Sequence, residues 1–361
     1  MLGPKCICLV ALTIVTSSMV ILTRYSRSVI RDESDERYSA AVAVFFTEIL
    51  KFFAFFLVLF VSTSGELRYI SIVHEFFTCV SSFIIDFRAG LSWVESANIF
   101  KREILQERGE TAKLAIPGAC YTLQNNLLYV ALTNLNAGIY SVTAELKILT
   151  TAVFSILLLN RRLKFAHWIC LLVLTVGVSL VQYSSHEENC LDPADCSAKN
   201  AQMNQSLGLV SVLVACVMSG FAGTYFERAL KHGSNSRLSV RSMQLGLWSL
   251  LFAAFGVGVE SCRRSSSLLA GFAPLTWAVV FIQAVNGVTV AATMKYADNI
   301  LKCFATAISI ILSSFVSFYV LGDLHPSSLF LLGSILVISS TFSYGNLKKP
   351  ASSRFSPVLK F

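Results

Sequence analysis

Charged residues are scarce in this chain of 361 residues. Only 14% are Asp, Glu, Lys or Arg, while 55% are hydrophobic, and the mean hydropathy is +0.66. Soluble domains usually carry about 25% charged residues, so the composition excludes that class and indicates a protein that crosses a membrane several times. The net charge of +8 does not indicate nucleic acid, because positive loops beside anionic cytosolic lipid are usual in membrane proteins.

The chain also lacks the motifs of the common enzyme and metal-binding classes. It contains no zinc-ligand spacing, no glycine-rich loop of the kind that cradles nucleotide phosphates, no Ser-His-Asp constellation and no D-x-D motif. Its five histidines fall in or next to the predicted loops. These absences predict a protein that is not an enzyme, with no catalytic residues, no metal and no cofactor.

Ten apolar stretches are long enough to cross a bilayer, which takes about 20 residues each. They cover residues 6–23, 39–62, 114–132, 138–159, 165–183, 206–227, 240–259, 273–294, 300–321 and 327–345. The predicted fold is therefore an all-α polytopic membrane protein of ten transmembrane helices. Within the long loop 65–113, residues 72–87 are short and polar for a span, so we expect an interfacial helix. An eleventh span is the alternative.

The distribution of positive charge predicts the orientation. An even number of spans places both termini on one side, and the loops on that side hold most of the 29 lysines and arginines. Positively charged loops stay in the cytosol, so both termini are predicted to be cytosolic. Cys190 and Cys196 share a loop on the other side, where a disulfide is permitted, and two free thiols are the alternative.

One lysine, Lys147, lies inside the apolar stretch 138–159. An ammonium near the bilayer midplane costs a few kcal/mol, so it should face a cavity or a partner and marks a functional site. The surrounding pattern, L-K-x-x-x-T-A-[V/I], occurs at 146–153 and again at 301–308, where the lysine is Lys302. A duplicated unit predicts a transporter built from two repeats, with its site where the repeats meet. A chance match is the alternative.

Further polar residues lie in the predicted spans. Tyr121 and Asn125 share a helix face and lie among other amides, which favours the wall of a polar cavity over a single helix contact. Tyr140 lies two helical turns before Lys147, on the same face. Gly220 allows close approach by a neighbouring helix or by a ligand.

Two acidic residues in the spans need partners. Glu48 and Lys51 are three apart on one helix face, which predicts a pair with a structural or gating role, and we favour the structural one. Glu145 is two residues from Lys147 and should point to another face, so we expect it not to neutralise that lysine. It would instead be protonated or meet a cation on another helix, for which Lys51 is the nearest candidate by type if Glu48 leaves it free.

These residues together predict a pocket for a bulky dianion. Lys147 and Lys302 would bind phosphates, amides would contact a base, and tyrosines would stack or donate hydroxyls. A nucleotide sugar fits this description, and other organic anions fit the same physics. Asn299 and Lys302 also lie at the start of a helix, a position that favours anions.

Several motifs in the chain are similar to those of a known protein family. They are RYSR (24–27), YTLQNNLLYVAL (121–132), LKILTTA (146–152), VRSMQLG (240–246) and KYADNILK (295–302). The chain resembles the Golgi nucleotide-sugar transporters, in the branch that carries UDP-N-acetylglucosamine, UDP-galactose and CMP-sialic acid. Within this branch, its sequence is most similar to the UDP-N-acetylglucosamine members. The resemblance implies two inverted five-helix repeats. They would cover 1–183, including the loop 65–113, and 206–345, joined by the lumenal loop 184–205 and followed by a cytosolic tail, 346–361.

The resemblance also implies an activity and a site. The activity is exchange of a cytosolic UDP-sugar for lumenal UMP, with the bilayer as surroundings and uridine preferred over cytidine. CMP-sialic acid transport, export of other metabolites and a non-transporting scaffold for glycosyltransferases are the alternatives, and self-association is a further possibility. The family's ligand-contacting positions fall on Tyr121, Asn125, Tyr140, Lys147, Gly220, Ser242 and Lys302. The chain departs from the common family pattern at Ser141, Ala144, Glu145 and Ser242.

Overall fold

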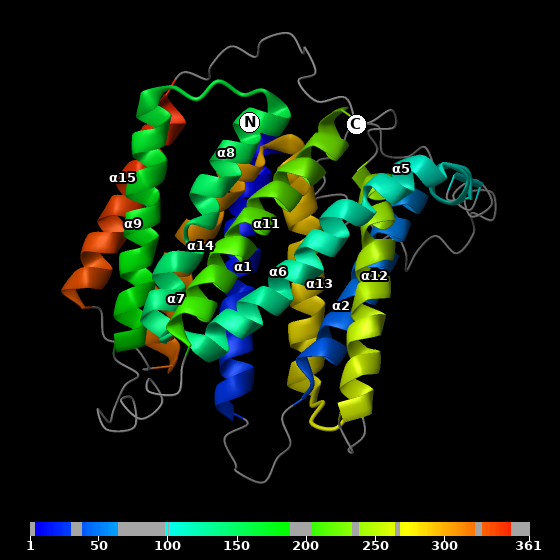
Figure 1. Cartoon of the computed structure of the whole chain (residues 1–361), viewed down its shortest axis with the longest axis horizontal. Helices are drawn as coiled ribbons and strands as arrows, with labels where there is room; N and C mark the ends of the chain where they lie inside the picture. Colours follow the sequence, from blue (N-terminus) through cyan, green and yellow to red (C-terminus); the bar gives the residue numbers. More distant parts are fainter. Residues whose placement is uncertain are drawn as a thin grey trace. The chain divides into compact units, whose positions relative to one another are not determined.

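The structure is a computed structural model, and it describes residues 4–29, 38–63, 98–99, 101–187, 204–232, 238–263, 268–321 and 327–347. Every regular element of this part is helical (Figure 1), which confirms the predicted all-α class. The elements are α1 Pro4–Val29, α2 Ala40–Thr63, η1 Lys101–Gln106, α5 Arg108–Lys113, α6 Ala115–Asn134, α7 Ala137–Ala144, α8 Lys147–Leu159, α9 Phe165–Glu187, α11 Gln205–His232, α12 Leu238–Arg263, α13 Pro274–Tyr296, α14 Asn299–Leu321 and α15 Ser328–Asn346.

Nine helical stretches in the described part are long and apolar enough to cross a membrane. They correspond to nine of the ten predicted spans, so the protein is a multi-pass membrane protein. The other predicted span, 114–132, forms the 20-residue helix α6 but is not among the nine, and Gln124, Asn125 and Asn126 interrupt its apolar sequence. The count of ten and the inverted arrangement of repeats stay predictions.

Several predicted features lie outside the described residues. They are the interfacial segment 72–87, the cysteines Cys190 and Cys196, and the tail from 348 onward. The end of the long loop is described, as η1 and α5.

The chain divides into two compact units, each of which draws helices from both halves of the sequence. Unit 1 comprises Met1–Ala119 and Ala229–Asp298, and unit 2 comprises Cys120–Arg228 and Asn299–Phe361. The units are defined by packing, whereas the predicted repeats follow chain order. The repeat boundaries at 183 and 206 therefore stay predictions.

In unit 1, polar side chains join helices that lie in apolar surroundings. The Thr16 hydroxyl of α1 donates to the Asn286 side chain of α13 at 2.9 Å, and α2 packs against both α12 and α13. Glu48 and Lys51 form the predicted ion pair, at 2.5 Å. The lysine chain lies so close to Gly287 of α13 that an added Cβ would be 2.4 Å from its Cδ, so this pair is part of the α2–α13 packing.

The end of the long loop is fixed to α12. Trp248 donates its indole N–H to the carbonyl of Thr111 at 2.8 Å, and the Gln244 amide donates to the carbonyl of Glu103 at 2.9 Å. Arg241 donates to the Glu110 carboxylate at 2.7 Å. The first two bonds supply partners for backbone carbonyls of η1 and α5 that two such short helices leave open, and the third is an ion pair between side chains, so 101–113 is a folded part of unit 1.

In unit 2, α8, α9, α14 and α15 pack around an apolar core, and α9 lies beside α15 (Figure 1). Gly177 of α9 and Gly333 of α15 make the approach close, since a Cβ on Gly333 would be 2.7 Å from the Gly177 carbonyl oxygen. Small residues permit such packing of membrane helices. The two copies of the repeated motif contribute to this core through Ile148 and Ala152 of α8 and through Phe304 and Ala307 of α14.

Candidate functional site

The predicted continuous helix over 138–159 is divided at Glu145 and Leu146 into α7 and α8. The Leu146 N–H donates to the Thr143 carbonyl at 3.1 Å, and the Ile148 N–H donates to the Glu145 carbonyl at 3.0 Å. Bonds between residues three apart tighten a helix locally and shift the directions of the side chains that follow. Lys147 is thus the first residue of α8, not a residue in the middle of one helix.

Glu145 contacts Lys147, and the expectation that it would not was wrong. The Lys147 ammonium lies 3.2 Å from Glu145 Oε1. Lys51, the candidate partner of Glu145 on condition that Glu48 left it free, pairs with Glu48. A regular helix would point residues two apart to different faces. Here the tightened turn lies between the two residues, and the lysine side chain is long enough to reach back.

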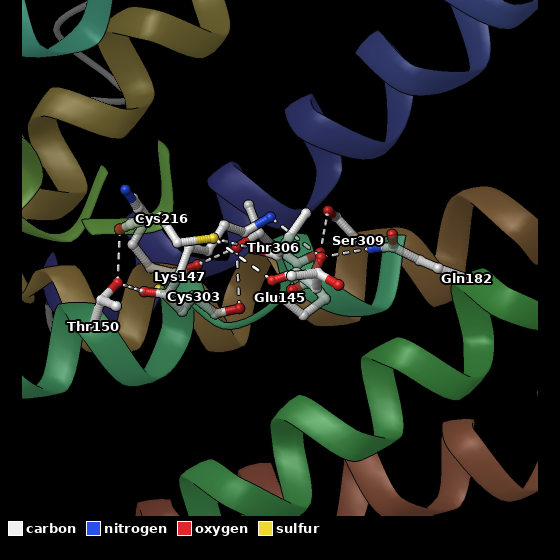
Figure 2. Close-up of polar contacts among 11 residues, drawn as sticks. Glu145, Lys147, Thr150, Gln182, Cys216, Cys303, Thr306 and Ser309 are labelled. Atoms are coloured by element: carbon white, nitrogen blue, oxygen red, sulfur yellow. Dashed lines mark hydrogen bonds and ion pairs between the residues drawn. The ribbon is translucent and has the colours of Figure 1, made fainter. Parts of the chain in front are cut away.

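Gln182 of α9 completes this group, and Figure 2 shows Glu145 between Lys147 and Gln182. The Gln182 amide donates to the same oxygen, Glu145 Oε1, at 2.7 Å. The Glu145 side chain is only 3% exposed, whereas that of Lys147 is 45% exposed. The carboxylate is therefore enclosed, while the lysine side chain is partly accessible, and its ammonium has three donors, of which the carboxylate accepts one.

Helix α11 packs closely against α8 beside the lysine. The Thr150 hydroxyl donates to the Cys216 carbonyl at 2.8 Å, and both residues are seen in Figure 2. A Cβ on Gly220 would be 2.8 Å from the backbone of Thr150 and Thr151. Of the two interpretations of Gly220, the structure shows helix packing, and a ligand contact there stays a prediction.

Lys302 lies in the first turn of α14, in the same unit as Lys147. The two ammonium groups are close enough for their charges to interact, and the Tyr140 hydroxyl also lies within electrostatic range of Lys147. Among the described residues, no carboxylate forms an ion pair with Lys302. Tyr140 and Lys302 are thus each within electrostatic range of Lys147, and all three residues are in unit 2.

The start of α14 already has an anion of its own. The Asn299 N–H donates to Glu227 Oε2 at 3.0 Å, and Arg161 binds the other oxygen of this carboxylate at 2.5 Å. Glu227 is completely buried. The helix terminus that was expected to favour a ligand anion therefore holds a protein carboxylate, and the binding of phosphate would depend on the Lys302 side chain.

The remaining predicted residues lie on α6 and α12. Tyr121 is half-buried and Asn125 is exposed, and the neighbouring Gln124 has a buried side-chain oxygen with no partner among the described residues. The cavity wall predicted for these amides stays a prediction. Ser242 is in unit 1, where its buried hydroxyl also lacks a partner in the described part of the chain.

Sequence reasoning did not single out Gln182, Thr150 or Cys216. Gln182 gave a signal of the same kind as Lys147, a polar side chain in an apolar stretch, but nothing in the sequence placed it against Glu145. The described residues contain no group of three or more His, Cys, Asp or Glu side chains that could hold a metal ion.

Comparison with known proteins identifies the family. The family model described as nucleotide-sugar transporter matches residues 2–77 and 67–345. The chain belongs to the nucleotide-sugar transporter family. This confirms the resemblance seen in the motifs, and it makes the protein a transporter, not an enzyme.

Individual relatives of this transporter cover nearly its whole length. The UDP-N-acetylglucosamine transporter of Homo sapiens is 42% identical over 93% of each chain. The UDP-galactose translocator of Canis lupus familiaris is 37% identical over 94% of this chain and 76% of its own. A solved crystal structure with 15% identity matches at a TM-score of 0.56 over 94% of this chain and 95% of its own, and that likeness shows the fold alone.

Proposed function

We propose that the protein is an antiporter that moves a UDP-sugar, either UDP-N-acetylglucosamine or UDP-galactose, from the cytosol into the Golgi lumen in exchange for UMP. The names of the relatives in two mammals support the substrate class. The main supporting observation is that Lys147 and Lys302 lie in one unit, within electrostatic range of each other. Each is in the first turn of its helix.

The chemistry of the substrate matches this pair. A UDP-sugar carries two negative charges on its diphosphate, and ammonium groups make strong charge-assisted hydrogen bonds with phosphate oxygens. Two like charges in a membrane protein raise the energy of the empty site, and a bound dianion relieves that repulsion. Tyr121, Tyr140 and Asn125 would then contact the base and sugar, with Gly220 as a further member of the site in unit 2.

The membrane arrangement follows from the positive loops. Both termini would lie in the cytosol, since the loops on their side hold most of the lysines and arginines. Partners beyond the nucleotide sugar, the nucleoside monophosphate and the bilayer would be a second copy of the chain or a glycosyltransferase.

Counterflow uptake tests the proposed activity. The full chain is reconstituted into vesicles preloaded with UMP or CMP, and uptake of labelled UDP-N-acetylglucosamine, UDP-galactose and CMP-sialic acid is measured. UMP-loaded vesicles should accumulate a UDP-sugar. Stronger uptake of CMP-sialic acid into CMP-loaded vesicles would assign the CMP-sialic acid type, and no uptake of any nucleotide sugar would favour the scaffold or another metabolite.

A further inference from the structure

Glu145 places a negative charge beside the lysine that is proposed to bind phosphate. The arrangement contains two ammonium groups, on Lys147 and Lys302, and one enclosed carboxylate. Among the described residues, this carboxylate forms an ion pair with Lys147 alone. Binding a diphosphate needs the two cations but not the anion. The position of the Glu145 carboxylate beside Lys147 is therefore not accounted for by phosphate binding alone.

We propose that Glu145 is a specificity-determining residue that limits the affinity of the site for highly charged nucleotides. This inference rests on the proposed function. Glu145 reduces the summed charge of the site from two positive charges to one, so each negative charge of a ligand meets repulsion from the carboxylate as well as attraction from the lysines. The repulsion grows with ligand charge, so it disfavours a nucleoside diphosphate more than a monophosphate.

The geometry makes Glu145 a fixed counter-ion. Its Oε1 accepts from Gln182 at 2.7 Å and from Lys147 at 3.2 Å, and its side chain is 3% exposed, so it cannot turn into water. Lys147 also cannot leave it without leaving a buried carboxylate without its cation, which is strongly unfavourable. A phosphate must therefore share Lys147 with Glu145 by using the remaining ammonium donors.

The role of Gln182 follows from the shared oxygen. Because the Gln182 amide donates to Oε1, it competes with Lys147 for this oxygen and weakens the ion pair between Glu145 and Lys147. Gln182 is thus a positioning residue, which acts on the ligand only through Glu145 and Lys147. Its loss should make the ion pair tighter.

The test compares ligands that differ only in charge. Dissociation constants of uridine, UMP and UDP are measured by calorimetry on the purified full chain at one ionic strength. Glu145→Gln removes the charge but keeps an oxygen that can accept from Gln182. It should tighten UMP binding roughly tenfold and UDP binding by a larger factor, while uridine binding stays within about twofold. Glu145→Asp should keep the wild-type pattern, because it keeps the charge.

The matched control is Glu110→Gln, which removes an ion-paired carboxylate outside the spans and should leave all three constants unchanged. An equal shift for uridine, UMP and UDP in Glu145→Gln would mean a merely structural role and would overturn the inference, as would weaker binding of the two nucleotides. A wild-type protein that binds no uracil ligand would overturn the proposed function itself, and the inference with it.

If Glu145→Gln does not yield folded protein, a second variant tests the inference. Gln182→Leu should weaken UMP and UDP binding, UDP the more, and leave uridine unaffected, because the carboxylate then binds Lys147 alone. Unchanged affinities for both nucleotides in folded Gln182→Leu would contradict the role of the carboxylate as a counter-ion.

Discussion

At the scale of single residues, Lys147 and Lys302 carry like charges in one unit, but their surroundings differ. Lys147 has a buried carboxylate at 3.2 Å, whereas Lys302 forms no ion pair within the described part of the chain. Before a ligand binds, Lys302 is therefore the less compensated cation. The two lysines should both contribute to phosphate binding, though not through identical environments.

Replacing either lysine should weaken the binding of phosphate-bearing ligands. A charge-assisted contact contributes about 1.5–3 kcal/mol, so Lys147→Ala and Lys302→Ala should each weaken UMP binding by about ten- to a hundredfold. Calorimetry on the purified variants measures this. Lys113→Ala, at an exposed lysine paired with Glu110, is the control and should bind normally. Wild-type affinity in folded alanine variants would exclude the two-lysine site.

Sequence reasoning found Lys147 and Lys302 because a charge within an apolar stretch is visible in the sequence itself. It failed for the partner of Glu145, since it assumed regular helical periodicity, and the tightened turn at Glu145 and Leu146 changes the direction of the side chains. That turn lies where α7 and α8 pack against α9, so it depends on contacts between segments far apart in sequence. Gln182 was missed for the same reason.

At the scale of helices, Glu227 joins three segments of unit 2. It lies on α11, binds Arg161 just after α8, and accepts from the first N–H of α14. The side chain is completely buried, so the loss of its charge removes a buried anion from both a guanidinium and a helix terminus. This arrangement fixes the start of the helix that carries Lys302.

We therefore expect Glu227→Gln to destabilise the protein by about 3–5 kcal/mol, as is usual when one partner of a buried ion pair is removed. Thermal unfolding of the purified protein measures the change. Glu107→Gln provides the control, because Glu107 is exposed and surface substitutions usually stay within about 0.5 kcal/mol. Equal melting temperatures for the two variants would show that Glu227 does not brace these helices.

The junction of α5 with α12 should respond to acid. Burial alone would raise the pKa of the Glu110 carboxyl, but hydrogen bonds and charges from Lys113 and Arg241 outweigh it and lower that pKa below its ordinary value of 4.5. A carboxyl whose pKa is lower in the folded state stabilises the fold above its unfolded-state pKa, and this stabilisation is lost as the pH falls through the folded-state value.

The stability of the wild-type protein should therefore fall more between about pH 5 and pH 3 than that of Glu110→Gln, which has no group to protonate at this position. Melting temperatures of both proteins across this range, taken in the same detergent, give the difference. Parallel curves for the two proteins would show that the pair of Glu110 and Arg241 does not stabilise the fold.

At the scale of the whole molecule, the sequence predicts the helices well but not their partners. Nine spans agree with helices that are long and apolar enough to cross a membrane, because apolar length is a local property. The division into two units is different. Unit 2 combines α8 with α14, which are about 150 residues apart in the chain. In the sequence, only the repeated motif around Lys147 and Lys302 indicated that these two helices belong together.

Helix α6 decides the topology of the chain. Nine crossings would place the termini on opposite sides of the membrane, whereas ten place them on one side, and α6 is the helix by which the two counts differ. It has 20 residues, enough for a crossing, and its amides can be satisfied if they line a cavity and do not face lipid. With ten crossings, the loops on the side of the termini hold most of the lysines and arginines, as is usual for cytosolic loops.

We therefore predict that α6 crosses the membrane and that both termini face the cytosol. In sealed Golgi vesicles, epitope tags at either end should be cleaved by added protease without detergent, while a tag inserted after residue 195, in the loop 184–205, should be cleaved only after the vesicles are opened. The inserted tag is the internal control for sealing. Protection of one terminal tag alone would mean an odd number of crossings and would contradict the prediction: either α6 does not cross the membrane, or the segment 72–87 crosses it as an eleventh span.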